Sequence, residues 1–251
     1  MSGVLPVVGA TESIGGGDGI FGAYVAAPRF ERHGAVIVLH EMFGVNAFMR
    51  GVCDSLAARG YRTICPDLYW RLSPGVELSD GSVAEIERGL SLLAAFDHEA
   101  ALRDLAQTCV HLRQRIGAAD KIAAIGYCLG GLLAYRAVAR ELVDCGVSYY
   151  GSGIHERLDE RYAISRPLLL HVPDKDQTTP PGAAAAIADA FAGHPSVSVY
   201  LYPGLDHAFA RVDTKYFQYV PDAADLADRR TDEFLEAWLS DKAIARASTV
   251  N

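Results

Sequence analysis

Residues 126–131 read Gly-Tyr-Cys-Leu-Gly-Gly, and the segments on either side of them have different patterns. Residues 121–125 before them form a mostly apolar run typical of a strand, and residues 132–137 continue as an apolar helix. A sharp strand-to-helix turn flanked by glycines is the G-x-S-x-G pattern, here with cysteine in place of serine. Glycines permit the turn, and the N-terminus of the helix favours a thiolate. The stretch therefore predicts Cys128 as a sulfur nucleophile.

Cys128 taken by itself also has a purely structural interpretation. Glycine-rich turns between strand and helix are common in α/β proteins, and free cysteine is among the most buried residue types. The catalytic interpretation therefore depends on a base, an acid and an oxyanion hole that appear at the matching places along the chain.

Length and composition indicate a single domain. The chain has 251 residues, of which 50% are hydrophobic, so one α/β core can be buried. The net charge of −8 argues against nucleic acid or an anionic membrane as a partner. The first residues lack a signal-peptide pattern, and no apolar run is long enough to span a membrane. We expect one cytoplasmic domain over residues 1–251, with a frayed tail from about residue 241.

The cysteines and histidines do not form a metal-binding pattern. There are five cysteines, an odd number without a CxxC pair, which is typical of reduced thiols. Cys53, Cys109 and Cys145 lie in apolar segments, where core packing is their expected role. None of the eight histidines forms an HxxxH or HxxEH pair. We predict no metal and no cofactor.

Apolar strand patterns alternate with helical patterns along the chain. Strands are expected at 21–27, 35–40, 61–65, 121–125, 145–150, 167–172 and 197–202. Helices are expected through residue 58 with Asn46 as cap, at 82–115 with a break at 96–98, after the turn at 126–131, from 180, and at 223–239. The first 20 residues are glycine-rich and predict an edge hairpin or an irregular lead-in. This alternation indicates a largely parallel, doubly wound α/β sheet flanked by helices.

Two loops that follow later strands carry an acid and a histidine. Asp176 lies in loop 173–180 and His207 in loop 203–211, and both loops leave the C-terminal ends of strands. The chain order nucleophile, acid, histidine is that of the α/β-hydrolase triad, so we predict Cys128, Asp176 and His207 as the triad. Asp174 is the alternative acid, and either aspartate alone could simply cap the next helix. An isolated His207 would more often be a surface loop residue than a base.

The loop after the central strand reads His-Glu-Met-Phe-Gly over residues 40–44, where an oxyanion-hole loop is expected. The backbone N–H groups of Met42 and Leu129 could converge on a developing oxyanion. Glu41 would be unusual in such a site, since its carboxylate would either hydrogen-bond the Cys128 thiol or disfavour the thiolate. Its alternative role is a structural salt bridge.

Five motifs together resemble the dienelactone hydrolase family over residues 21–239. They are HEMFGVNAFMR at 40–50, CPDLY at 65–69, AFD at 95–97, GYCLGG at 126–131 and HAFAR at 207–211. The resemblance implies an α/β-hydrolase fold in which Cys128 is the nucleophile, His207 its base and Asp176 the orienting acid. It further implies that Glu41 holds the resting thiol, that Arg211 contacts a substrate carboxylate and that Tyr149 lines the pocket. Leu129 and Met42 would supply the oxyanion N–H groups.

One part of the pocket departs from the family pattern. Members that act on dienelactone carry a second arginine before the Ala-Phe-Asp motif, and the corresponding residue here is Ile86. Arg88 lies two residues further on, about 200° around a helix, so it is expected to face elsewhere. Leu90 and Leu93 replace an expected tyrosine and tryptophan. Together with Phe43, these residues predict a more apolar substrate-binding wall.

Three functions are consistent with these patterns. The first is hydrolysis of an enol lactone, of the type that converts dienelactone to maleylacetate, through an acyl-enzyme on Cys128. The second is a related carboxylesterase or thioesterase acting on a more apolar, activated ester or lactone. The third is a non-catalytic binding module. The expected partner is a small lactone or ester, and the expected state is a monomer or weak homo-oligomer.

Overall fold

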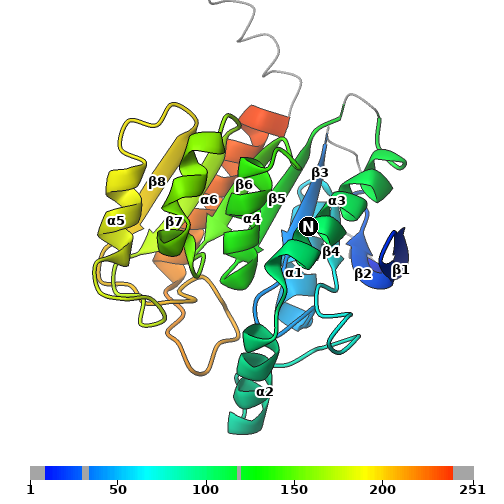
Figure 1. The fold of residues 1–251 in the computed structure, drawn as a ribbon, viewed down its shortest axis with the longest axis horizontal. Coiled ribbons are helices and arrows are strands. Elements are labelled where there is room, and N and C mark those ends of the chain that lie inside the picture. Colours follow the sequence, from blue (N-terminus) through cyan, green and yellow to red (C-terminus); the bar gives the residue numbers. More distant parts are fainter. Residues whose placement is uncertain (1–8, 30–33, 118–119, 240–251) are drawn as a thin grey trace, which may run out of the picture.

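The computed structural model describes residues 9–29, 34–117 and 120–239 and contains one eight-stranded sheet with helices on both faces (Figure 1). The strand order is β1-β2-β4-β3-β5-β6-β7-β8. β1 pairs antiparallel with β2, β2 pairs antiparallel with β4, and all the other pairs are parallel. This is the predicted α/β-hydrolase fold, a largely parallel, doubly wound sheet. The expected frayed tail lies outside the described residues.

The element bounds follow the predicted alternation closely. The strands are β1 (Gly9–Gly16), β2 (Gly19–Ala26), β3 (Ala35–Leu39), β4 (Arg62–Pro66), β5 (Ile122–Tyr127), β6 (Cys145–Tyr149), β7 (Leu168–Pro173) and β8 (Val197–Tyr202). The helices are α1 (Ala47–Ala58), α2 (Val83–Ala94), α3 (His98–Arg113), α4 (Leu129–Ala139), α5 (Ala183–Ala190) and α6 (Pro221–Leu239), with two short 3₁₀ turns at Ile154–Glu156 and Leu158–Ala163. The edge hairpin is confirmed as β1 and β2.

One helix begins later than the sequence predicts. Prolines at 180 and 181 suggested a first turn, but α5 begins only at Ala183, after Gly182 in a left-handed conformation with φ +90°. The prolines therefore shape the loop that leads to the helix. The break predicted within 82–115 is confirmed, because α2 ends at Ala94 and Asp97 caps α3 through the Glu99 and Ala100 N–H groups.

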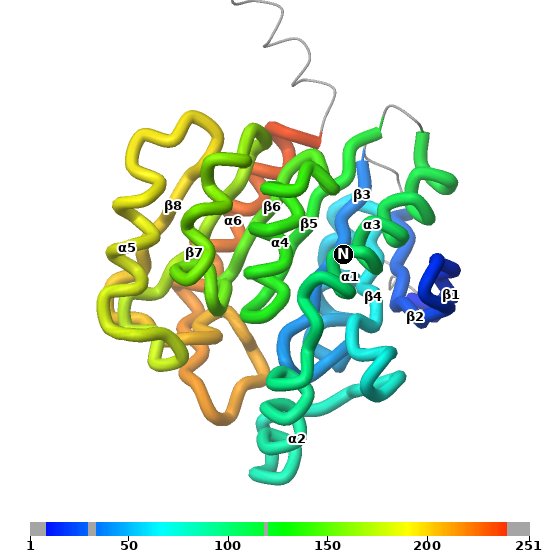
Figure 2. The backbone as a smooth tube through the Cα atoms, in the orientation of Figure 1, coloured from blue at the N-terminus to red at the C-terminus, as the bar shows by residue number. Residues whose placement is uncertain are grey.

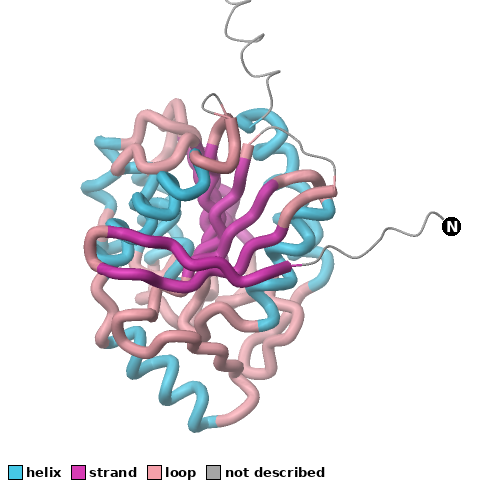
Figure 3. The backbone as a smooth tube through the Cα atoms, turned by 90° about the vertical axis from the view of Figure 1, so that its right-hand side faces the viewer, coloured by secondary structure: helices cyan, strands magenta, loops and turns pink. Residues whose placement is uncertain are grey.

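Both faces of the sheet are buried, as the apolar strand runs require. On β3, Ile37 and Leu39 belong to the cluster beneath α3, α4 and α5, whereas Val36 and Val38 belong to the cluster beneath α1 and α6. Figure 3, viewed from the hairpin side, shows the sheet twisting strongly from β1 and β2 to the distant strands. Among the helices of the described ranges, none is long and apolar enough to cross a membrane.

Helix α2 stands apart from these layers. Figures 1 and 2 show it below the sheet, beside the long loop between β8 and α6. It is capped by Ser82, whose side chain accepts from the Glu85 N–H. Leu92 of α2 is buried in the core cluster beneath α3, α4 and α5, which anchors the C-terminal half of the helix.

Candidate active site

Cys128 occupies a strained turn between β5 and α4. Its backbone has φ 55° and ψ −115°, a conformation that costs free energy for a residue with a Cβ and that often marks functional sites. The flanking glycines permit the turn: a Cβ on Gly126 would lie 1.8 Å from the Gly130 carbonyl oxygen, and one on Gly130 would lie 2.1 Å from that of Leu39. Close backbone contacts therefore hold the Cys128 side chain at the C-terminal edge of the sheet.

The structure brings the three predicted triad residues together. His207 Nδ1 lies 2.8 Å from Asp176 Oδ2, and both side chains are almost fully buried. A hydrogen bond between Cys128 and His207 is among the causes that raise the pKa of His207. Asp174 instead accepts from the Gly204 N–H at 2.6 Å and so connects the two loops. Asp176, not Asp174, is the aspartate that contacts the histidine.

The electrostatics favour a charged His207 between Asp176 and Cys128. Burial opposes a charge on His207, but the Cys128 thiolate and the hydrogen bonds with Asp176 and Cys128 raise its pKa to about 10. Burial acts to raise the pKa of Asp176, and hydrogen bonds from His207 and Thr178 hold it below its usual range. His207 is therefore protonated around neutral pH, held between the Asp176 carboxylate and the Cys128 sulfur.

Several neighbours of the triad were not predicted. The Ser152 Oγ lies 3.4 Å from the Cys128 Sγ, and Thr178 Oγ1 lies 2.6 Å from Asp176 Oδ1 and 3.2 Å from His207 Nδ1. The Tyr150 ring packs edge-on against His207 with centroids 5.0 Å apart. Tyr150 and Ser152 follow β6, so their position after a parallel strand is the signal that could have identified them.

The prediction that Tyr149 lines the pocket is wrong. Its hydroxyl donates to Asp228 Oδ1 at 2.8 Å and lies 2.7 Å from Thr231 Oγ1, and both partners are on α6. Side chains alternate along a strand, so Tyr149 points to the α6 face of the sheet. Tyr150 is the tyrosine beside His207, because its positive φ of 40° turns the chain at the end of β6.

The two predicted oxyanion donors lie beside Cys128 with their N–H groups free of protein acceptors. Leu129 is the first residue of α4, a position without an intrahelical acceptor, and neither its N–H nor that of Met42 donates to another residue in the described ranges. The Met42 loop is held by a buried neutral histidine: His40 Nδ1 contacts the Glu41 carbonyl at 2.7 Å, and its Nε2 accepts from the Leu68 N–H. Burial lowers the pKa of His40, consistent with that neutral form.

Glu41 contacts Arg211, and its carboxylate accepts no hydrogen bond from the Cys128 thiol among the described residues. Glu41 Oε1 lies 3.0 Å from Arg211 Nη1, with both side chains at most 4% exposed. A buried carboxylate gains more from a guanidinium than from a thiol, so the salt bridge replaces the contact that the family resemblance implied. Burial raises the pKa of Glu41 to about 7, although Arg211 and His207 oppose this.

Arg211 is surrounded by acidic side chains. Besides Glu41, its Nε lies 2.7 Å from Asp213 Oδ1 and its Nη2 lies 3.7 Å from Asp80 Oδ1. The Phe43 ring stacks on its guanidinium with the centroid at 4.7 Å. One buried cation is therefore shared by three carboxylates.

A cavity of about 360 Å³ lies over Cys128 and His207, within the size range of small-ligand sites. Its apolar wall is formed by Ile86, Leu90 and Leu93 of α2, facing Phe43, Tyr216 and Phe217. Glu41, Met42, Asp80, Ser152, Thr178 and Arg211 also line it. Arg88 is exposed and is not part of the lining, so it does not supply the missing second arginine. Among the described residues, no group of three or more His, Cys, Asp or Glu is arranged to hold a metal ion.

Comparisons with known proteins agree with this geometry. Residues 21–239 match the Dienelactone hydrolase family. A relative from Azospirillum brasilense is 39% identical over 228 residues, covering 89% of this chain and 96% of that protein. The carboxymethylenebutenolidase 1 of Cupriavidus pinatubonensis is 35% identical over 223 residues, covering 89% and 94%.

A solved structure shows the same fold. The dienelactone hydrolase from Anabaena variabilis superposes with a TM-score of 0.68 at 20% identity, covering 93% of this chain and 99% of that one. At that identity the likeness concerns the fold, whereas the family match and the closer relatives concern the activity. The chain therefore belongs to the dienelactone hydrolase family and is a hydrolase acting on ester or lactone bonds.

Proposed function

We propose that the protein hydrolyses enol lactones, in the manner that opens dienelactone to maleylacetate, through Cys128, His207 and Asp176. The observation that carries this proposal is the cysteine on a strained strand-to-helix turn, next to a histidine 2.8 Å from a buried aspartate and beneath a cavity of ligand size. The names of the relatives add support, because the protein from Cupriavidus pinatubonensis is a carboxymethylenebutenolidase.

The reaction divides into acylation and deacylation. The Cys128 thiolate attacks the lactone carbonyl carbon, and the oxyanion is held by the Leu129 and Met42 N–H groups. The ring C–O bond breaks, the acyl group remains on sulfur, and the enolate oxygen or its carbon takes the proton from His207. His207 then removes a proton from water, the resulting hydroxide attacks the thioester, and the thiolate leaves.

A sulfur nucleophile restricts which esters can react. In the tetrahedral intermediate a thiolate is expelled more readily than an ordinary alkoxide, so simple alkyl esters revert to starting material. An enolate, a phenolate or another thiolate is a better leaving group and competes with Cys128. This argument supports activated substrates such as enol lactones, whichever substituents the ring carries.

The cavity wall supports a second candidate. Ile86, Leu90 and Leu93 form an apolar face at the position where a second arginine would be needed to bind an acidic substrate. This observation favours a related esterase or thioesterase acting on an apolar, activated ester or lactone. A non-catalytic binding module would leave the His207–Asp176 hydrogen bond and the strained Cys128 without a role.

The test is ultraviolet-monitored hydrolysis of cis- and trans-dienelactone and of an activated aryl ester, with wild type and Cys128→Ala. We expect kcat/KM to fall by roughly 10⁴-fold or more in Cys128→Ala for every substrate that the wild type cleaves, because the nucleophile is lost. Cys109→Ala is the matched control, since Cys109 is a buried residue of α3 and does not line the cavity. Equal turnover by wild type and Cys128→Ala would rule out the proposal.

A further inference from the structure

Three buried polar atoms at one end of the cavity have no hydrogen-bond partner among the described residues. They are Glu41 Oε1, Asp80 Oδ1 and Arg211 Nη2. Their side chains are 1–4% exposed, and all three residues line the cavity that contains Cys128. A buried polar atom without a partner costs about 1–3 kcal/mol, so three in one place indicate a function that uses them.

The distances between these three atoms leave one donor, Arg211 Nη2, and two acceptors, Asp80 Oδ1 and Glu41 Oε1, without hydrogen bonds. Arg211 Nη2 and Asp80 Oδ1 are 3.7 Å apart, too far for a hydrogen bond between them but close enough for one small group to contact both. The contact of Glu41 Oε1 with Arg211 Nη1, at 3.0 Å, is an ion pair without hydrogen-bond geometry. A group placed here thus meets one N–H donor flanked by carboxylate oxygens.

Asp80 cannot turn away from this position. Its other oxygen, Oδ2, accepts from Thr214 Oγ1 at 2.7 Å, from the Lys215 N–H at 2.8 Å and from the Tyr216 N–H at 3.0 Å. Burial acts to raise the pKa of Asp80, but these hydrogen bonds and Arg211 hold it below its usual range. Asp80 therefore remains a fixed anion at neutral pH, directed at the cavity.

We propose that this end of the cavity binds a neutral substituent that both donates and accepts a hydrogen bond, a hydroxyl or a primary amide, and that Asp80 excludes a substrate carboxylate. The inference rests on the proposed function and names the class of substrate for the same site. A hydroxyl can accept from Arg211 Nη2 while it donates to Asp80 Oδ1. A carboxylate offers only acceptors, and in a buried space it would meet the fixed charge of Asp80.

The first experiment compares substituents on one scaffold with the wild-type enzyme. Four enol lactones carry carboxylate, carboxamide, hydroxymethyl or methyl at the exocyclic position, and kcat/KM is measured for each. We expect kcat/KM for the carboxamide, the hydroxymethyl compound or both to be at least tenfold higher than kcat/KM for the carboxylate. It should also be higher than kcat/KM for the methyl compound. A carboxylate that reacts as well as the neutral polar analogues overturns the inference. Equal values for methyl and both polar neutral groups also overturn it, because no polar subsite would then exist.

The second experiment removes the charge of Asp80. Asp80→Asn keeps an acceptor for the loop and is expected to raise kcat/KM for the carboxylate at least tenfold, mainly through KM, with a smaller change for the methyl compound. Glu87→Gln is the control, because it removes one negative charge from the exposed face of α2 without touching the cavity. An unchanged carboxylate-to-methyl ratio in Asp80→Asn, with turnover of the methyl compound retained, overturns the role of Asp80.

Failure of this inference is distinct from failure of the proposed function. If Cys128→Ala hydrolyses the four lactones as fast as the wild type, the cysteine mechanism is wrong, whatever the substituent ranking. If Cys128→Ala is inactive and the wild type prefers the carboxylate, the mechanism stands and the neutral subsite is wrong. Should Asp80→Asn fail to fold, the wild-type ranking alone decides.

Discussion

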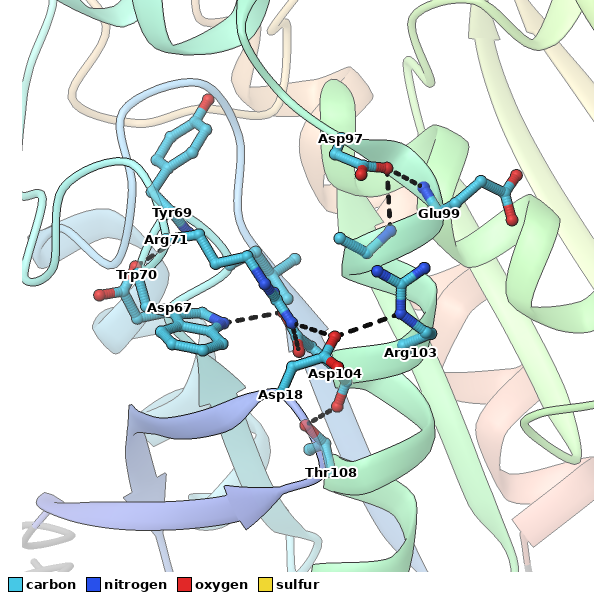
Figure 4. Close-up of polar contacts among 12 residues, drawn as sticks. Asp18, Asp67, Tyr69, Trp70, Arg71, Asp97, Glu99, Arg103, Asp104 and Thr108 are labelled. Carbon is cyan, nitrogen blue, oxygen red and sulfur yellow. Dashed lines mark hydrogen bonds and ion pairs between the residues drawn. The ribbon is translucent and has the colours of Figure 1, made fainter.

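Two arginine clusters in this protein differ in how completely they are paired. Figure 4 shows the first, at the β1–β2 hairpin, where Arg71 contacts Asp104 and lies 2.7 Å from Asp18, which also accepts from Arg103 Nε at 3.2 Å. Trp70 Nε1 donates to Asp104 at 2.9 Å. The second is Arg211, with Glu41, Asp80 and Asp213 around it.

The first cluster balances its charges and the second does not. Two arginines face two aspartates around Arg71, and none of these side chains has a buried atom without a partner. Around Arg211 one cation faces three carboxylates, and three atoms remain without a hydrogen-bond partner among the described residues. In a cluster that only stabilises the fold, every buried polar atom is expected to have a hydrogen-bond partner. In a cluster that binds a substrate, some polar atoms are expected to have no protein partner until the substrate is bound.

Removing the central cation should affect stability most in the unbalanced cluster. Arg211→Met leaves Glu41 and Asp80 buried without a counter-charge, so we expect the free energy of unfolding to fall by about 3–5 kcal/mol. Urea unfolding at pH 7 measures this. A loss below about 1 kcal/mol would mean that the carboxylates find other partners and that the cluster is not held by Arg211.

Glu41 should make the unbalanced cluster sensitive to pH. Its folded-state pKa of about 7 is above the ordinary value of 4.5, so the folded protein binds the proton more tightly and stability is lost as pH rises through this interval. Relative to Glu41→Gln, the wild type should lose roughly 3 kcal/mol between pH 4.5 and 7, at about 1.4 kcal/mol per pH unit. Urea unfolding of both proteins across this range measures it. Parallel stability curves would contradict the assigned shift.

Loss of Arg71 from the balanced cluster should lower the free energy of unfolding less than loss of Arg211, and it should not affect catalysis. Arg71→Met leaves the buried Asp104 with the Trp70 N–H as its remaining side-chain donor, so we expect a loss of about 1–2 kcal/mol in unfolding free energy. kcat/KM should stay within about twofold of the wild type, because Arg71 does not line the cavity. A large fall in kcat/KM with an unchanged melting temperature would connect the hairpin to the site.

The outermost pair of the balanced cluster should matter least. Asp18 is partly exposed, so salt screens its attraction to Arg71 and Arg103. We expect Asp18→Asn to destabilise the protein less than Arg71→Met, and we expect the difference from wild type to shrink in high salt. Thermal unfolding at low and high salt tests this. A difference that grows with salt would indicate a packing role for Asp18.

Local patterns were sufficient to predict most of the fold and the residues of the proposed triad. Apolar runs predicted the strands because both faces of the sheet are covered. Asn46 was predicted as a cap from its residue type and position, and its side chain accepts from the Met49 N–H at the start of α1. Cys128, Asp176 and His207 were predicted from their positions after strands, and parallel strands bring such positions to one edge. The family resemblance, with positions counted back from the Ala-Phe-Asp motif, placed Ile86, Leu90 and Leu93 on the same wall.

The sequence by itself determined the alternation of strands and helices, the turn at Cys128 and the apolar face of α2, because these depend on neighbouring residues and their periodicity. Only the tertiary structure decided that Tyr150 rather than Tyr149 faces His207, since a positive φ at the strand end reverses the alternation. It also decided that Glu41 and Asp80 both face Arg211. Those partners are far apart in sequence, and their pairing depends on charge and burial that appear only when the loops pack together.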